Sequence, residues 1–89
     1  MTKIEITEVG DAFEVVVSDA HGQTRHSVRA GAAQLQRLAP GSPPKRVIEA
    51  AFRFLLDREA KESILTRFAL ADIARYFPEF ERVISDYLP

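Results

Sequence analysis

The side chains that could carry out chemistry are few in this sequence, and the first to consider are its histidines. His21 and His26 are the only two imidazoles, and Asp19 is the carboxylate nearest to them in the sequence. On one strand, positions 21 and 26 would point to opposite faces, so the two rings could share a metal ion only if a turn redirected one of them. We therefore predict no metal site, with His21 in a turn and His26 half-buried on a strand.

Nucleophilic and acid-base catalysis are no better indicated. The chain has no cysteine, and none of its serines stands in the glycine-flanked turn that exposes a nucleophile. The four glycines are too far apart to form a phosphate-binding loop. Acidic pairs such as Glu59 and Glu62 lie in charged surroundings, whereas acid-base work requires burial that shifts a pKa. We therefore predict that the protein is not an enzyme and binds no cofactor.

A basic segment, residues 23–46, is the first candidate for a binding surface. It contains five basic residues and no acidic one, whereas residues 1–22 contain one basic and five acidic residues. The segment could contact phosphate, as in small bacterial regulators or antitoxin-like proteins, although this rests on analogy between folds. Stacking on bases is not expected, because the segment has no aromatic residue except His26. The candidate phosphate contacts are Arg25, Arg29, Arg37, Lys45 and Arg46.

The alternative for this segment is neutralisation by the acidic strands before it. Exposed charges usually serve only to solvate a surface. The acidic side chains that could pair with the basic ones are Glu5, Glu8, Glu14 and Asp19. Whether the basic segment is exposed or neutralised is left open by the sequence.

Three aromatic residues around a proline, Tyr76-Phe77-Pro78-Glu79-Phe80, make the second candidate surface. Aromatic and arginine side chains are favoured at the energetic centres of protein interfaces. We expect Phe77 and Phe80 to close the core while the proline turns the chain. Tyr76 lies off the apolar face of its segment, so the candidate surface for a partner is Tyr76, with Arg75 and Glu79.

The element that must position these residues is a central helix, PPKRVIEAAFRFLLD, at residues 43–57. At 100° per residue its apolar side chains spread over about 200°, roughly twice the width found on a surface helix. Such a helix must be covered on two sides. Ser42 followed by Pro43 favours a start at this point. The end is left open, because the charged run after Asp57 could continue the helix or form a turn.

The cover on one side is a sheet. Residues 4–7 alternate with period two and residues 13–17 are rich in β-branched side chains, so both are predicted strands of an antiparallel sheet with one covered face. Residues 23–28 form a weaker third strand with an inward row of Thr24, His26 and Val28. Its polarity predicts a position at the edge of the sheet.

The cover on the other side is a set of short helices. Ser63 could cap the first of them, the apolar face changes near Ala69, and Pro78 can begin the last one. The predicted fold class is α+β, with an N-terminal three-stranded antiparallel meander packed on the central helix and two or three short C-terminal helices after it. The expected strands cover about 3–9, 13–19 and 23–28, and the expected helices about 31–39, 43–60, 63–68, 70–77 and 78–88.

The size and composition of the chain suit one domain, residues 1–89, with a modest core. A reducing compartment is compatible with a chain without cysteine. The chain begins without a cationic region followed by an apolar run and has no long apolar segment. We therefore expect a cytoplasmic protein.

Residues 52–84, FRFLLDREAKESILTRFALADIARYFPEFERVI, resemble a pattern found in a family of short uncharacterised bacterial proteins. In that pattern an aromatic-Leu-Leu core helix precedes Arg-Glu, Glu-Ser-Ile-Leu and Tyr-Phe-Pro-Glu. This chain departs from it at Ala60, where the pattern has proline, and at Ala69, where it has an acidic residue. The resemblance implies a small bacterial protein and no catalytic activity.

From these observations we predict a small non-catalytic module that works through protein contact. The apolar excess of the central helix favours a homodimer, because a short chain has little material to cover it. The alternative function is nucleic-acid binding by a regulator or antitoxin-like protein that uses residues 23–46. The identity of the partner cannot be deduced from the sequence.

Overall fold

The computed structural model describes residues 1–88, and three strands open the chain. β1 (Lys3–Val9), β2 (Ala12–Asp19) and β3 (Gly22–Arg29) form an antiparallel meander. Gly10 forms the first turn with a φ of 63°, a backbone conformation that glycine adopts without strain. The predicted fold class, α+β with an antiparallel meander packed on a central helix, is confirmed, although the sheet has a fourth strand.

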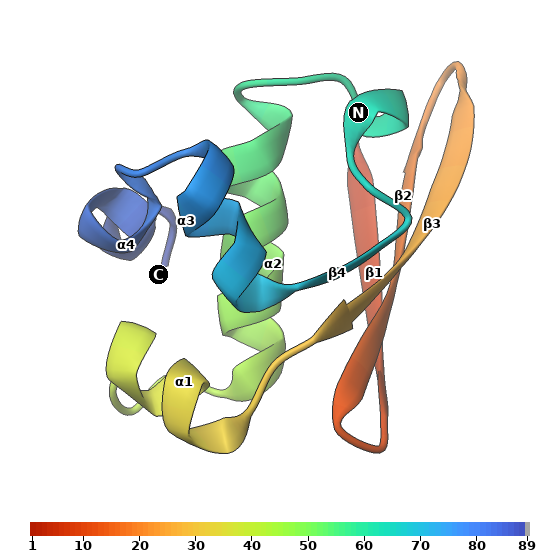
Figure 1. The fold of residues 1–89 in the computed structure, drawn as a ribbon. Helices are drawn as coiled ribbons and strands as arrows, with labels where there is room; N and C mark the ends of the chain where they lie inside the picture. The colour runs from red at the N-terminus through yellow and green to blue at the C-terminus, as the bar shows by residue number, and fades with distance from the viewer. Residues whose placement is uncertain (89) are drawn as a thin grey trace.

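The central helix α2 (Pro44–Leu56) lies between two layers (Figure 1). The sheet lies on one side of it and the C-terminal helices on the other. The short helix α1 (Ala32–Leu38) precedes it and lies near its N-terminal end. The predicted start is right to within one residue, but the helix is shorter than the predicted 43–60, because the backbone turns after Leu56. Ala60 is extended, with a ψ of 154°.

Side chains from all layers form a single buried cluster around α2. On α2 itself, Phe52 and Phe54 are completely buried, whereas Glu49 and Arg53 face water and form an ion pair of 2.8 Å. Each large apolar side chain buried in this way contributes about 1.5–3 kcal/mol. The residues that cover α2 from the sheet are Phe13, Val15, Val17 and Val28, and those from the C-terminal part are Leu70, Ile73, Phe80 and Ile84.

The predicted helix at 63–68 is wrong. A single 3-10 turn, η1 (Lys61–Ser63), leads into extended backbone and then into β4 (Arg67–Ala69), which pairs in parallel with the end of β3. Ser63 therefore ends a turn and does not cap a helix. The spacing of Ile64 and Phe68, four residues apart, puts both on one face of a helix but also on one face of a strand. Both side chains are buried.

β4 also changes the position of β3 in the sheet. The strand order is β1-β2-β3-β4, so the C-terminal half of β3 is not an edge, contrary to the prediction. The inward row of Thr24, His26 and Val28 is as predicted, with Thr24 half-buried and Val28 buried. His26 is buried and not half-buried as predicted, because the segment before β4 covers it. The free edges of the sheet within residues 1–88 are β1, the short strand β4 and the N-terminal half of β3.

The C-terminal part consists of single helical turns. η2 (Leu70–Asp72) continues into α3 (Ile73–Tyr76), and α4 (Phe80–Val83) continues into η3 (Ile84–Tyr87). These turns lie within the predicted ranges 70–77 and 78–88. Within residues 1–88, no helix has both the length and the apolar character needed to cross a membrane.

Two buried polar side chains tie the segment after α2 to the sheet. His26 is 2% exposed, and its Nδ1 lies 2.8 Å from the Leu65 carbonyl oxygen. Lys61 is 5% exposed, and its Nζ lies 3.0 Å from a carboxylate oxygen of Asp19, at the end of β2. A second carboxylate, that of Glu62, lies 2.7 Å from the same Nζ. These contacts fix η1 and β4 against β2 and β3.

Candidate functional site: a groove beside Tyr76

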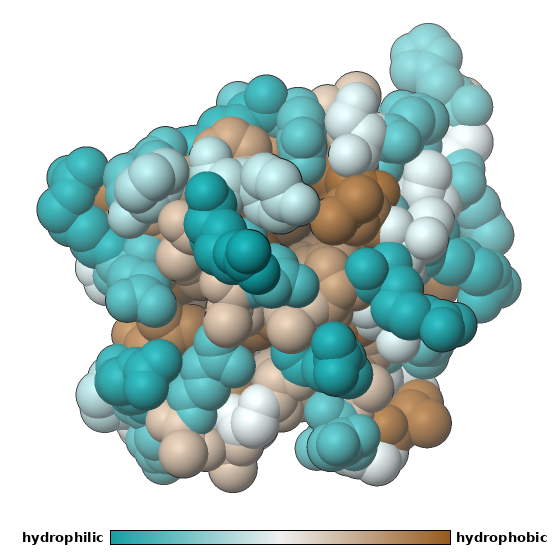
Figure 2. Space-filling model, in the orientation of Figure 1, coloured by the Kyte–Doolittle hydropathy of each residue, from teal (hydrophilic) through white to brown (hydrophobic). Residues whose placement is uncertain are grey.

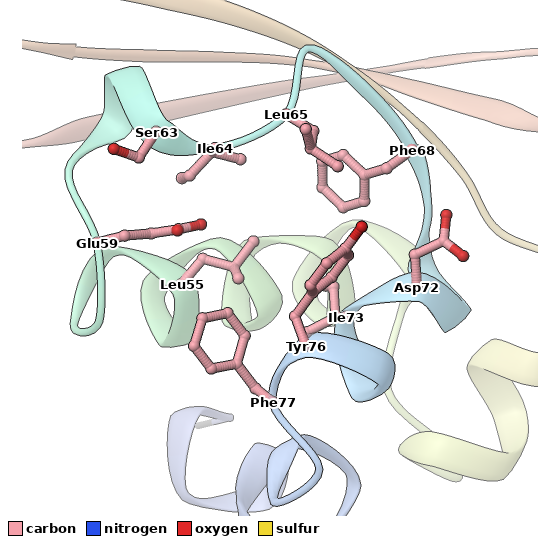
Figure 3. Close-up of a pocket in the computed structure, with 10 residues that line it drawn as sticks. All are labelled: Leu55, Glu59, Ser63, Ile64, Leu65, Phe68, Asp72, Ile73, Tyr76 and Phe77. Atoms are coloured by element: carbon pink, nitrogen blue, oxygen red, sulfur yellow. The ribbon is translucent and has the colours of Figure 1, made fainter.

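A groove of about 390 Å³ opens between the segment that follows η1 and helix α3. The end of α2 forms its floor, and Figure 3 shows Tyr76 extending across it toward Leu65 and Phe68. The lining is mainly apolar. The lining residues are Leu55, Glu59, Ser63, Ile64, Leu65, Phe68, Asp72, Ile73, Tyr76 and Phe77.

Two of these side chains are large, apolar and unusually accessible. Leu65 is 52% exposed and Tyr76 is 69% exposed, and they account for two of the four exposed large hydrophobic side chains in residues 1–88. Figure 2 shows hydrophobic side chains open to solvent on this side of the molecule, surrounded by hydrophilic ones. An exposed apolar surface with a polar rim is typical of interaction sites.

Local hydrogen bonds hold the two walls of the groove. On one wall, the His26 imidazole contacts the Leu65 carbonyl oxygen, as described above. On the other wall, the backbone N–H of Ala69 donates to the Asp72 carboxylate at 3.1 Å, which sets the turn from β4 into η2. The Phe77 N–H then donates to the Ile73 carbonyl oxygen at 2.8 Å and closes α3. The walls are therefore fixed by contacts that do not involve the exposed side chains.

Two carboxylates give the groove a negative rim. Glu59 is half-buried in the lining and makes no ion pair with any other side chain of residues 1–88. Asp72 accepts the Ala69 N–H, and its other oxygen lies 3.7 Å from the exposed Arg75 guanidinium. Glu59 is therefore the charge in the groove that can receive a cation from outside.

The structure separates the three residues predicted as a partner surface. Tyr76 lies in the groove, and Arg75 is exposed beside its rim through the ion pair with Asp72. Glu79 points elsewhere, because it is bound to Arg58 at 3.2 Å. A backbone hydrogen bond and the Arg58 guanidinium hold the pKa of Glu79 below its usual value. Phe77 and Phe80 both contact the Phe54 ring, so these two aromatic residues belong to the core.

Arg58 is occupied by contacts within the chain. Its guanidinium carbon lies 3.7 Å from the centre of the Phe54 ring, and one of its nitrogens lies 3.3 Å from the Tyr87 hydroxyl. The Tyr87 hydroxyl in turn donates to Asp57 at 2.7 Å. These contacts hold the last helical turn, η3, against the end of α2. Arg58, Asp57 and Tyr87 therefore have a structural role.

The five basic residues of segment 23–46 are exposed but do not form one surface. Arg25 and Arg29 lie on the face of the sheet that is turned away from α2, whereas Arg37 lies in α1 and Lys45 and Arg46 lie in the first turn of α2. Within residues 1–88 none of them forms an ion pair with an acidic side chain. The sequence had left neutralisation by Glu5, Glu8, Glu14 and Asp19 open, and the structure shows no such pairs.

The sequence does not predict a part in any binding surface for Leu65, Glu59, Asp72 or Arg67. Leu65 falls within the predicted helix at 63–68, which does not form. The signal in the sequence is that, if residues 64–68 are read as a strand, Leu65 is an apolar side chain on the face opposite to Ile64 and Phe68. Arg67 was assigned to the same helix, so its position on the sheet could not be foreseen.

The groove contains no metal-binding or nucleophilic constellation. Within residues 1–88, no three His, Cys, Asp or Glu side chains gather closely enough to hold a metal ion. His26 faces the core, where its ring is tilted against Phe52 with 5.3 Å between the ring centres. His21 lies in the turn between β2 and β3, as predicted, and its backbone N–H donates to the Asp19 carboxylate at 2.8 Å.

Comparison of the chain with protein-family models, with curated proteins and with solved structures finds no match. The fold alone therefore defines the class of protein. It is a small α+β protein in which a four-stranded sheet and a set of short helical turns enclose one central helix. The resemblance of residues 52–84 to short bacterial proteins stays a prediction.

Proposed function

We propose that this protein is a non-catalytic interaction module that binds a partner protein in the Tyr76 groove. The observation that carries this proposal is the pair of exposed apolar side chains, Leu65 and Tyr76, on opposite walls of one groove. Tyrosine is favoured at interface centres because it combines a large apolar ring with a hydroxyl that can stay hydrated. Burying both side chains against a partner would contribute several kcal/mol.

The partner chemistry follows from the charge of the groove. Glu59 forms no ion pair within residues 1–88, so a partner segment is favoured if it presents one large apolar side chain next to a lysine or arginine. The apolar side chain would lie between Leu65 and Tyr76, and the cation would lie over Glu59. We place this interaction in the bacterial cytoplasm, in keeping with a chain that lacks cysteine and resembles bacterial proteins.

A peptide-display selection on the full chain tests the proposal. We expect the selected peptides to share a large apolar residue next to a basic one. Tyr76→Ala and Leu65→Ser should each weaken the best peptide by about tenfold or more. Val9→Ser is the matched control, because Val9 is an exposed hydrophobic residue on β1 that does not line the groove.

Charge reversal makes the test sharper. Selection on Glu59→Lys should yield an acidic residue in place of the basic one, while the apolar position stays. The proposal is refuted if Tyr76→Ala and Val9→Ser select the same peptides as the wild-type chain with unchanged affinity.

A second copy of the chain is the competing occupant. Light scattering at tens of micromolar separates the two cases. A dimer that becomes monomeric in Tyr76→Ala would identify the homodimer as the occupant of the groove, whereas a monomer that binds the selected peptides supports a separate partner.

A further inference from the structure

The solvent-facing side of β3 and β4 carries three arginines arranged around one hydroxyl. Arg25, Ser27 and Arg29 alternate along β3 on the face turned away from α2, where both arginines are exposed. The parallel pairing of the two strands places Arg67 directly opposite Ser27. Arg67 is exposed on the same face, because its neighbour Phe68 is buried on the other. We call these three arginines with Ser27 the β3/β4 arginine surface.

None of these arginines is neutralised within residues 1–88. Among residues 1–88, no acidic side chain lies within ion-pair distance of Arg25, Arg29 or Arg67. Of the acids on the strands, Asp19 is bound to Lys61, and Glu5 lies 3.9 Å from Lys3.

The acid nearest to this surface in the sheet register is Glu14. It stands opposite Ser27 on the side away from β4, so one row across the sheet reads Thr7, Glu14, Ser27 and Arg67. Glu14 is exposed and takes part in no ion pair within the part of the chain that the structure describes. It lowers the positive potential of the surface without bonding to any of the arginines.

The arrangement suits a row of phosphate groups. A guanidinium presents a planar fork of N–H donors that matches the oxygens of a phosphate. Arg25 and Arg29 are four residues apart on one strand, which is roughly 13 Å. Phosphates of one nucleic-acid strand advance by about 3.4 Å along the helix axis, so the distance between Arg25 and Arg29 corresponds to about four steps from one phosphate to the next. The surface has no aromatic side chain on which a base could stack.

We propose that the β3/β4 arginine surface binds the phosphate backbone of a nucleic acid without reading its sequence. Arg25 and Arg29 would contact phosphates at the two ends of this span, and Arg67 with the Ser27 hydroxyl would contact a phosphate between them. Arg37, Lys45 and Arg46 would not take part, because they lie on the helices and not on the sheet. Glu14 would oppose binding through its charge.

Fluorescence anisotropy with the full chain and a labelled 20-nucleotide duplex tests this proposal, with the matching single strand and inorganic phosphate as further probes. At 50 mM monovalent salt, Arg25→Gln and Arg67→Gln should each weaken binding roughly tenfold. Each should also reduce the slope of log affinity against log salt by about one. Glu14→Gln should tighten binding by about twofold or more. Arg37→Gln and Lys45→Gln are the controls, since they change the net charge equally but should leave the affinity within about twofold.

The outcomes separate the possible ligands. Inorganic phosphate at millimolar concentration could compete with the labelled duplex as well as an unlabelled oligonucleotide does at the same concentration of phosphate groups. That result would identify a site for a single phosphate and overturn the nucleic-acid proposal. Equal losses in Arg67→Gln and Lys45→Gln would show diffuse charge attraction and would also overturn it. So would a wild-type dimer that dissociates in Arg25→Gln, because a second copy would then cover the surface. The gain in Glu14→Gln is a result that loss of folding cannot imitate.

Discussion

Replacing His26 by leucine should loosen the segment that carries both the groove and β4. The Leu65 carbonyl oxygen can only accept, so His26 Nδ1 carries the proton of the 2.8 Å bond between them. His26 Nε2 lies 2.8 Å from the Thr24 hydroxyl, which donates to it when the ring is neutral. Both ring nitrogens are therefore satisfied inside a side chain that is almost fully buried.

The magnitude follows from the groups that are left without partners. Leucine keeps an apolar contact with Phe52 but removes the donor from the Leu65 carbonyl, which costs about 1–3 kcal/mol. At about 2 kcal/mol, a domain of this size should lose roughly 8–16 °C in Tm. Thr24→Val is the matched comparison, because it leaves His26 Nε2 without a donor, at a similar cost of about 1–3 kcal/mol, but keeps the bond to the Leu65 carbonyl oxygen.

Hydrogen exchange shows whether the loss is local. The Ser27 N–H donates to the Thr66 carbonyl oxygen at 2.7 Å, so its exchange reports on the segment that His26 holds. In His26→Leu this amide should exchange faster relative to the Val15 amide, by about tenfold for each 1.4 kcal/mol of local destabilisation. A His26→Leu protein with the wild-type Tm, or with equal changes at Ser27 and Val15, would refute this explanation.

Three further predictions concern stability. The N–H of His21 and the Lys61 ammonium hold the pKa of Asp19 below its usual value, so the carboxylate contributes stability that is complete above about pH 5 and is lost as the pH falls below about 4. Thermal unfolding between pH 3 and 7 should show a shallower acid-side decline in Asp19→Asn, and an unchanged decline would argue against this source. Phe54→Ala should cost about 3–5 kcal/mol in urea unfolding, because the ring is fully buried against Phe77, Phe80 and Tyr87, and a cost below about 1.5 kcal/mol would contradict that packing. Gly10→Ala should cost about 1–2 kcal/mol because of the positive φ, whereas Gly31→Ala, at an ordinary φ, should cost less; equal losses would contradict the turn geometry.

The elements with regular apolar spacing could be predicted from the sequence, because the spacing itself specifies their geometry. α2 has one polar stripe and is otherwise buried, and over Phe13–Val17 every second side chain of β2 is buried while the two between are more accessible. The segment 63–69 could not be predicted, because its decisive interaction is with β3, about forty residues away in the sequence. The spacing of apolar residues within a segment contains no information about pairing with a distant strand. It also does not distinguish a helix from a strand here, because both bring Ile64 and Phe68 to one face.

The same limit applied to the candidate site. Tyr76 could be selected, because it falls outside the apolar face of its own segment. Glu79 also looked free in sequence, yet Arg58, which lies on the turn after α2, binds it. Leu65 and Arg67 are positioned by the contacts of residues 65–69 with β3, so neither could be selected from the sequence. Residues whose positions follow from local periodicity could thus be predicted from the sequence, and residues whose positions follow from long-range strand pairing could not.

The two proposed surfaces share this one unpredicted segment. Leu65 contributes to the groove on one side of it, and Arg67, two residues later, lies on the outer face of the sheet. Because the His26 contact holds the backbone between them, His26→Leu should weaken both peptide binding in the groove and duplex binding on the arginine surface. Tyr76→Ala should affect only the peptide and Arg25→Gln only the duplex. Loss of a single activity in His26→Leu would show that the two surfaces do not depend on a common support.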